Sequence, residues 1–211
     1  MGKRQARKSI YPFDTWIAFL LCAGAAAATF TIDVEARQVV LWCVLLALGL
    51  IYLRVLRGEP AHPPADLARG AAAGLILALP ILLLLQPELT AIAARLLPGQ
   101  SDAAVFQGLV LIAPLAEELF FRGLLQKQHG LVAGALLYGL YLLLFFLPGV
   151  VDFALVGLAV CLAGALFGFI YGYVNERYGL GAAIACHAAV SFVLFFMPLV
   201  VPDAARWLRA I

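Results

Sequence analysis

Two adjacent glutamates and an arginine lie inside an apolar segment of the chain, which runs from about Ala103 to Leu125. In a helix, Glu118 and Arg122 share one face, and the glutamate has the favourable N-terminal place in the pair. Glu117 points about 100° away from Glu118, so one arginine would not neutralise both carboxylates equally. A carboxylate without a cation in an apolar site suits a general base that activates water. An ion pair that orients two helices would explain Glu118 and Arg122 but would leave Glu117 without a reason.

A histidine in a later apolar run is the expected partner of these carboxylates. Of the three histidines, only His187 lies well inside an apolar run. Counted from the same end of the two spans, Glu118 and His187 lie roughly 13 Å and roughly 10 Å deep, at about 1.5 Å per residue. Ser191 follows one helical turn later and shares the face of His187. These depths predict one shared site, formed by the acidic motif and His187.

The composition predicts a protein that lives in a membrane. Hydrophobic residues make up 65% of the 211 residues and charged residues 12%, whereas a soluble domain is about a quarter charged. A charge near the bilayer centre costs roughly 2.5 kcal/mol or more, so the charges that remain there are expected to act in catalysis or binding. Residues 1–211 are therefore expected to form one integral membrane domain.

The apolar runs predict an all-α fold, a polytopic bundle of about seven transmembrane helices of about 20 residues each. The expected spans are residues 15–32, 39–55, 70–85, 103–127, 131–147, 153–174 and 180–200. A loop is expected at residues 86–102, with a short helix inside it at 91–97. Lysines and arginines are more frequent on the side that holds the N-terminus, which predicts a cytoplasmic N-terminus. The basic N-terminal tail suits a bacterial inner membrane.

The acidic motif Glu-Glu-x-x-x-Arg at residues 117–122, the intramembrane His187 and the glycine-rich run before it resemble the CPBP family. That family contains the CAAX prenyl-protein endopeptidases and the bacteriocin-processing or Abi proteins. The resemblance covers about Val105 to Phe196 and implies a catalytic-type core of four spans at residues 103–200. It also implies an intramembrane, metalloprotease-like protease of the glutamate type. Such a protease hydrolyses a peptide bond in the tail, leader or sorting segment of a membrane-associated protein or peptide.

The second motif of the family departs from its pattern in this chain. The family pattern is Phe-x-x-x-His, and the best match in the fifth span begins at Tyr138 and ends at Leu142. Tyr138 keeps the aromatic residue, but Leu142 stands where the histidine is expected. Either Tyr138 or Tyr141 is a candidate to donate a hydrogen bond in place of that histidine. In the third motif, His-x-x-x-Asn, Ser191 stands where many members have asparagine.

The resemblance implies a role for each residue of an active site. Glu117 would be the general base, and Glu118, paired with Arg122, would orient the site. His187 would bind the attacking water or stabilise the tetrahedral intermediate, with Ser191 as a secondary donor. No cofactor is expected. If the site held a metal, it would be zinc bound by Glu117, Glu118 and His187.

Other functions are weighed against proteolysis. The zinc-protease motif His-Glu-x-x-His is absent from the sequence, and every aspartate lies in a loop or at the end of a span. The alternative to an enzyme is a non-catalytic membrane binding or immunity protein of the same fold, which the histidine missing at Leu142 favours. A small carrier that uses the two glutamates is a third class, but the chain lacks the inverted repeat of many carriers. The expected partners are the lipid bilayer and a membrane protein or a lipidated or hydrophobic peptide, and no nucleic acid.

Overall fold

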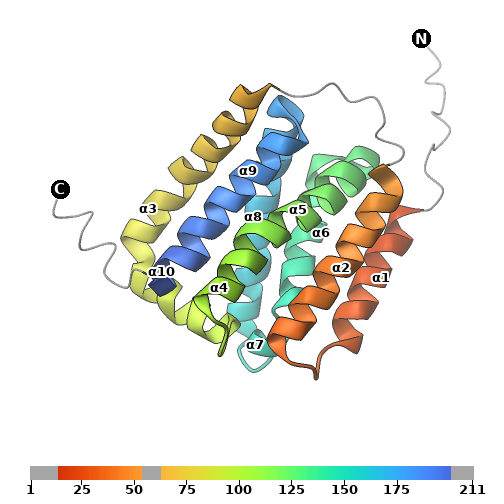
Figure 1. The fold of residues 1–211 in the computed structure, drawn as a ribbon. Helices are drawn as coiled ribbons and strands as arrows, with labels where there is room; N and C mark the ends of the chain where they lie inside the picture. Colours follow the sequence, from red (N-terminus) through yellow and green to blue (C-terminus); the bar gives the residue numbers. More distant parts are fainter. Residues whose placement is uncertain (1–13, 54–62, 201–211) are drawn as a thin grey trace, which may run out of the picture.

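The computed structural model describes residues 14–53 and 63–200, and its regular structure is helical throughout these ranges (Figure 1). The helices are α1 (Thr15–Ala28), α2 (Val34–Leu53), α3 (Pro64–Leu96), α4 (Asp102–Val105), η1 (Phe106–Ile112), α5 (Ala113–Phe120), η2 (Phe121–Leu125), α6 (Gln126–Phe145), α7 (Leu147–Val150), α8 (Ala154–Tyr178), α9 (Leu180–Ser191), η3 (Phe192–Phe196) and α10 (Met197–Val200). The three elements named η are π-helical and continue directly into their neighbours. The basic N-terminal tail and the residues after Val200 lie outside the described residues.

Five helical stretches in the described ranges are long and apolar enough to cross a membrane. They are Val34–Ile51, Pro64–Leu96, Asp102–Phe145, Ala154–Tyr178 and Leu180–Val200. The third of these, with 44 residues, reverses at Gly130, where φ is 84°, and Gln126 and Gly134 pack against each other across the reversal. It therefore supplies two of the predicted spans, and the 14-residue α1 adds a shorter apolar helix. The predicted all-α polytopic bundle is confirmed.

Helix α3 differs from the prediction, because it continues where a loop is expected. Leu85 has non-helical angles, with φ −124° and ψ 24°, two residues before Pro87. A proline inside a helix removes one backbone hydrogen bond, and its ring displaces the preceding turn. The helix therefore bends near Leu85 and then resumes as far as Leu96. The short helix expected at residues 91–97 is the last part of α3 rather than a separate element.

Close backbone contacts hold the helices around the acidic motif side by side. Gly70 and Gly74 of α3 lie against the backbone of α9, where a Cβ atom would have no room, and Gly139 of α6 lies against α8 in the same way. Small residues let helices approach closely in this manner. Figure 1 shows the result: α5, which carries the two glutamates, lies between α2 and α9, with α6 and α8 behind it.

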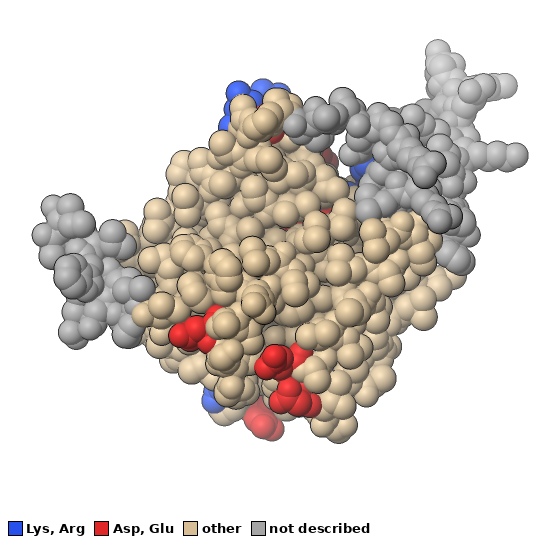
Figure 2. All heavy atoms as spheres, viewed as in Figure 1, with Lys and Arg blue, Asp and Glu red and all other residues tan. Residues whose placement is uncertain are grey.

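Charged side chains gather at the two ends of the bundle. The end at which α3 and α9 begin carries most of the exposed basic residues, and the opposite end is mainly acidic. The first end has Arg69, Lys127 and Arg177 with Asp14 and Glu176, and the second has Asp33, Glu35, Asp102 and Asp152 with Arg95. On the face shown in Figure 2, a broad and nearly uncharged band separates the two ends. This band and the apolar helices identify an integral membrane protein.

Candidate active site

The acidic motif lies on a helix whose winding changes on both sides of it. Helix α5 contains Glu117 and Glu118, and the π-helical η2 that follows contains Arg122. A second π-helical segment, η1, precedes α5. Single π-helical turns inside α-helices are frequent at functional sites. The sequence predicts an ordinary helix here, because hydropathy does not distinguish the two windings.

Glu118 has one partner near each of its two carboxylate oxygens. Its Oε2 lies 3.1 Å from Nε of Arg122, and its Oε1 lies 2.9 Å from Nδ1 of His187. The carboxylate is completely buried, and Arg122 is 1% exposed. Arg122 also donates from Nη2 to the Gly168 carbonyl at 3.0 Å, and its guanidinium lies 4.7 Å from the ring centroid of Tyr138. Glu118 therefore joins the cation of its own helix to the histidine of α9.

The partners of His187 assign its proton. Because the arginine-paired Glu118 accepts hydrogen bonds, Nδ1 of a neutral His187 carries the proton and Nε2 is left as an acceptor. Nε2 lies 3.3 Å from the Tyr138 hydroxyl and 3.9 Å from Oε2 of Glu117. The Tyr171 ring stacks on the imidazole, with centroids 4.6 Å apart and planes 14° apart. The ring is thus held with its free nitrogen toward Glu117.

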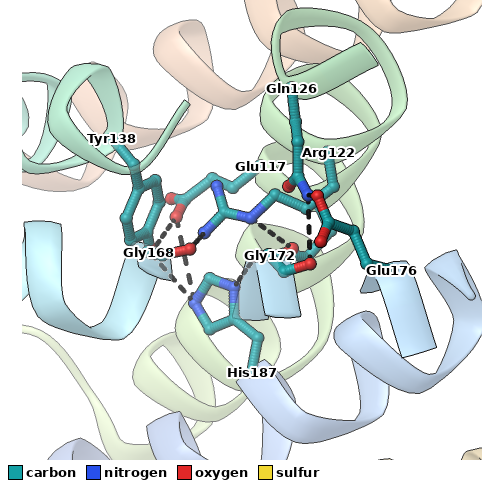
Figure 3. A network of polar contacts seen from close by, with 9 residues as sticks. Glu117, Arg122, Gln126, Tyr138, Gly168, Gly172, Glu176 and His187 are labelled. Carbon is teal, nitrogen blue, oxygen red and sulfur yellow. Dashed lines mark hydrogen bonds and ion pairs between the residues drawn. The ribbon is translucent and has the colours of Figure 1, made fainter. Parts of the chain in front are cut away.

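Glu117 has different partners from Glu118. Its Oε2 accepts a hydrogen bond from the Tyr138 hydroxyl at 2.8 Å, and its Oε1 accepts one from Nε1 of Trp42 at 3.3 Å. Both donors are neutral, so no arginine or lysine neutralises this carboxylate in the contacts of the described chain. Figure 3 shows Glu117, Tyr138 and His187 facing one another. Glu117 therefore differs from Glu118 in that both of its hydrogen-bond donors are neutral.

A cavity of about 230 Å³ opens beside this carboxylate. Its polar wall is formed by Glu117, Tyr138, His187 and Ser191, and the rest of the lining is apolar. The apolar lining comes mainly from the last part of α3 and from α6, α8 and η3. Leu142 is part of this apolar wall and supplies no ring nitrogen at the place where the family has a histidine. The cavity therefore places an apolar surface next to the carboxylate of Glu117 and the imidazole of His187.

The two candidate tyrosines have different positions. The hydroxyl of Tyr138 contacts both Glu117 and His187. Tyr141 is 1% exposed, and its hydroxyl has no hydrogen-bond partner among the described residues. The structure therefore brings Tyr138 into the site and leaves Tyr141 in the adjacent core. Trp42 and Tyr171 are the members that sequence reasoning missed, because a lone aromatic residue in an apolar run has no signal that separates it from core packing.

The network extends from the site toward the basic end of the bundle (Figure 3). Gln126 donates from Nε2 to the Gly172 carbonyl at 3.0 Å and to Glu176 at 3.1 Å. Together with the bond from Arg122 to Gly168, two side chains of the motif helix thus reach the backbone of α8. A Cβ atom at position 172 would lie 2.8 Å from Oε1 of Gln126. Gly172 of α8 thus leaves room for the side chain of Gln126.

The donor atoms of Glu117, Glu118 and His187 do not converge on one point. Glu118 contacts Nδ1 of the imidazole, whereas Glu117 faces Nε2, and these two nitrogens point away from each other. No group of three or more histidine, cysteine, aspartate or glutamate side chains in the described ranges could hold a metal ion. A protein zinc site needs at least three such ligands around one centre. The three residues named as zinc ligands therefore do not fit that role together.

Comparison with known proteins gives one family. Residues 99–193 match the family model Rce1-like, described as type II CAAX prenyl endopeptidase Rce1-like. No curated protein and no solved structure matches the chain. The family resemblance that the motifs predict is thereby confirmed for these residues, which include both glutamates, Tyr138 and His187. The match supports a CAAX-type intramembrane endopeptidase in general terms.

Proposed function

We propose, from the match of residues 99–193 to the Rce1-like endopeptidases, that this chain is an intramembrane endopeptidase in which Glu117 activates the attacking water. One observation carries the proposal. Glu117 and Nε2 of His187 face each other across 3.9 Å at the wall of an apolar cavity. Two acceptors so placed bind the two hydrogens of one water molecule and leave its oxygen free to attack.

The hydrolysis follows from these positions. The water oxygen attacks the carbonyl carbon of the substrate, and one water proton passes to Glu117. The Tyr138 hydroxyl then donates to the oxyanion of the tetrahedral intermediate, as in other oxyanion sites. The bond between carbon and nitrogen breaks as Glu117 gives its proton to the leaving nitrogen. His187 accepts a hydrogen bond from the second hydrogen of the water, which stays on the attacking oxygen as the hydroxyl of the intermediate, and no step passes through a metal.

The partners of the two glutamates support this division of roles. Both oxygens of Glu118 are occupied, by Arg122 and by His187. Its carboxylate is also absent from the cavity lining, to which Glu117 contributes. A base must reach the proton that it removes, through direct contact or one water. Glu118 accordingly orients His187, and Glu117 is the base.

Tyr138 is the proposed replacement for the histidine that is missing at Leu142. Its hydroxyl lies within hydrogen-bond distance of both Glu117 and His187, as the missing imidazole would have to. Tyr138 itself is 2% exposed and lines the cavity. Ser191 lines the same cavity and remains a secondary donor.

The proposed substrate is a membrane protein or a lipidated or hydrophobic peptide that enters from the bilayer. The mostly apolar cavity supports this class and offers no basic surface for a nucleic acid. The end that carries Arg69, Lys127 and Arg177 is proposed to face the cytoplasm, because basic residues are retained on that side. This orientation puts the N-terminus on the cytoplasmic side, as expected for a bacterial inner membrane.

One observation favours a second function, a non-catalytic binding or immunity protein of the same fold. Leu142 gives the cavity an apolar wall where the family has a histidine. A chain that only recognises hydrophobic segments would need the cavity but not the carboxylate of Glu117.

A survey of protein termini distinguishes the two functions. Membranes from cells that carry the native chain, Glu117→Gln or Glu88→Gln at equal abundance are compared for new protein ends. Glu88 is exposed on α3 and is absent from the cavity lining, so it is a matched control. Protease action predicts ends that are present with the native chain and Glu88→Gln and absent with Glu117→Gln. Identical termini in all three, with the variants folded, would contradict proteolysis and favour the binding protein.

A further inference from the structure

We infer that Trp42, on α2, is a positioning residue for the carboxylate of Glu117. Its indole Nε1–H donates to Oε1 of Glu117 at 3.3 Å, and this contact is buried. Trp42 lies outside residues 99–193, the part that matches the family. The inference therefore makes α2 a component of the site. It rests on the proposed function, because a positioned carboxylate matters only if Glu117 is the base.

The packing around the indole fixes its direction. Trp42 is 3% exposed, and its ring lies 5.6 Å from the ring of Phe145. The six-membered edge of the indole lies against Gly108, where a Cβ atom would be 2.7 Å from Cη2. Gly49 lets α2 approach α5 closely at Leu119. The indole is thus enclosed, and its N–H is directed at the carboxylate.

The two donors of Glu117 act on different oxygens. Trp42 binds Oε1, and Tyr138 binds Oε2. The terminal torsion of a glutamate has a broad minimum, so a carboxylate held by one donor can rotate, whereas two donors fix its plane. With the plane fixed, Oε2 faces Nε2 of His187. Misplacement of a reacting group by about 1 Å can cost on the order of 100-fold in rate.

Trp42 is distinguishable from a residue that binds substrate. It does not line the cavity, although Glu117, Tyr138 and His187 do. Loss of its N–H should therefore lower kcat and leave KM nearly unchanged. A purely structural residue would instead lower the folded fraction and leave kcat per folded molecule unchanged.

The contact is tested first without any substrate. The chain has three tryptophans, so a full-length chain with Trp16→Phe and Trp207→Phe retains only Trp42. Ultraviolet resonance Raman spectroscopy then reports the hydrogen bonding of that indole N–H. Glu117→Leu removes the acceptor and should shift the N–H band toward the unbonded position, whereas Glu88→Leu should leave it unchanged. A band that does not respond to Glu117→Leu overturns the inference.

The consequence is tested by hydrolysis of a prenylated CAAX-ended peptide in proteoliposomes. Trp42→Phe keeps most of the ring and removes the donor, and it should lower kcat about tenfold, the worth of one hydrogen bond to a charged group. Gly108→Ala keeps the donor but displaces the indole, and it should act in the same direction. Trp16→Phe changes a half-exposed ring on α1 and should retain full activity.

The outcomes separate the inference from the proposed function. Native activity of Trp42→Phe, with Glu117→Gln inactive, overturns the inference and leaves the proposed function intact. Activity that survives Glu117→Gln contradicts both the inference about Trp42 and the proposed function. A loss of kcat per folded molecule that is confined to Glu117→Gln, Trp42→Phe and Gly108→Ala, with the thermal unfolding temperature of Trp42→Phe near the native value, supports the positioning role.

Discussion

His187 separates two glutamates that are adjacent in the sequence. It turns Nδ1 to Glu118 at 2.9 Å and Nε2 toward Glu117 at 3.9 Å. One carboxylate is consequently bound to Arg122 and the imidazole, while the other faces a cavity with only neutral donors. A single ring thus gives two adjacent glutamates different surroundings, and this difference can be measured.

Substitution of Glu118 should destabilise the protein far more than substitution of Glu117. Glu118→Gln leaves Arg122 buried without its anion, and breaking such a pair costs about 3–5 kcal/mol. Glu117→Gln keeps an amide oxygen that can accept from Tyr138 or Trp42, so its cost should be below about 1.5 kcal/mol. Thermal unfolding in detergent, followed by circular dichroism, measures both. Equal destabilisation of the two variants would contradict the proposed division of roles.

Removal of single hydroxyl groups should distinguish the two tyrosines of α6. Tyr138→Phe removes a donor to Glu117 and to the oxyanion, and loss of such a donor lowers kcat by about 100-fold or more. Tyr141→Phe removes a buried hydroxyl that has no partner among the described residues, which should be neutral or slightly stabilising. Turnover of the prenylated peptide and the unfolding temperature are measured for both. A larger loss of turnover with Tyr141→Phe than with Tyr138→Phe would show that Tyr141, and not Tyr138, has the supporting role.

A histidine at Leu142 should raise turnover. The Leu142 side chain lies on the cavity wall one helical turn from Tyr138, so an imidazole there would be close to the attacking water of the proposed mechanism. Leu140→His is the matched control, because Leu140 is exposed on the same helix and is absent from the cavity lining. Initial rates in proteoliposomes are compared at equal folded protein. A rate that falls with Leu142→His, in a folded protein, would contradict the expectation that this site can use a histidine at position 142.

The sequence predicts the helices and the central members of the site for physical reasons. Apolar runs separated by turn residues locate the spans, and the common depth of Glu118 and His187 follows from the fixed rise of a helix. The bent continuation of α3 beyond Leu85 was predicted wrongly as a loop. A proline lowers the probability of a helix locally, but packing of the following apolar residues can restore it.

Contacts that depend on helix rotation and neighbour choice could not be predicted. Trp42 and Glu117 are 75 residues apart in the chain. Hydropathy shows that Trp42 lies in an apolar helix, but it does not show which neighbouring helix the indole faces. Tyr138 and Tyr141 point in directions about 300° apart around α6. Which of them faces Glu117 depends on how α6 packs against α5. Sequence reasoning limits the candidates, and packing of α2, α5 and α6 selects among them.

Arg37 is expected to stabilise the C-terminal ends of α1 and α6, and this expectation can be tested. The sequence places this residue near the start of the second span, yet the structure buries it to 1% exposure. Its guanidinium donates to the carbonyl oxygens of Ala26, Leu144 and Phe145, at 2.5, 2.5 and 3.3 Å. These carbonyls belong to the C-terminal ends of α1 and α6, where the helix dipole favours a cation.

Arg37→Met should therefore loosen both ends at once. It leaves three buried carbonyl groups without this donor, and each such loss costs about 1–3 kcal/mol. We expect a marked fall in the unfolding temperature and faster amide hydrogen exchange at the ends of α1 and α6. Arg95→Met is the matched control, because Arg95 is exposed and lies over the ring of Phe153, so its loss should cost less than about 1 kcal/mol. Exchange that increases equally in both variants would contradict a specific role of Arg37 in joining α1, α2 and α6.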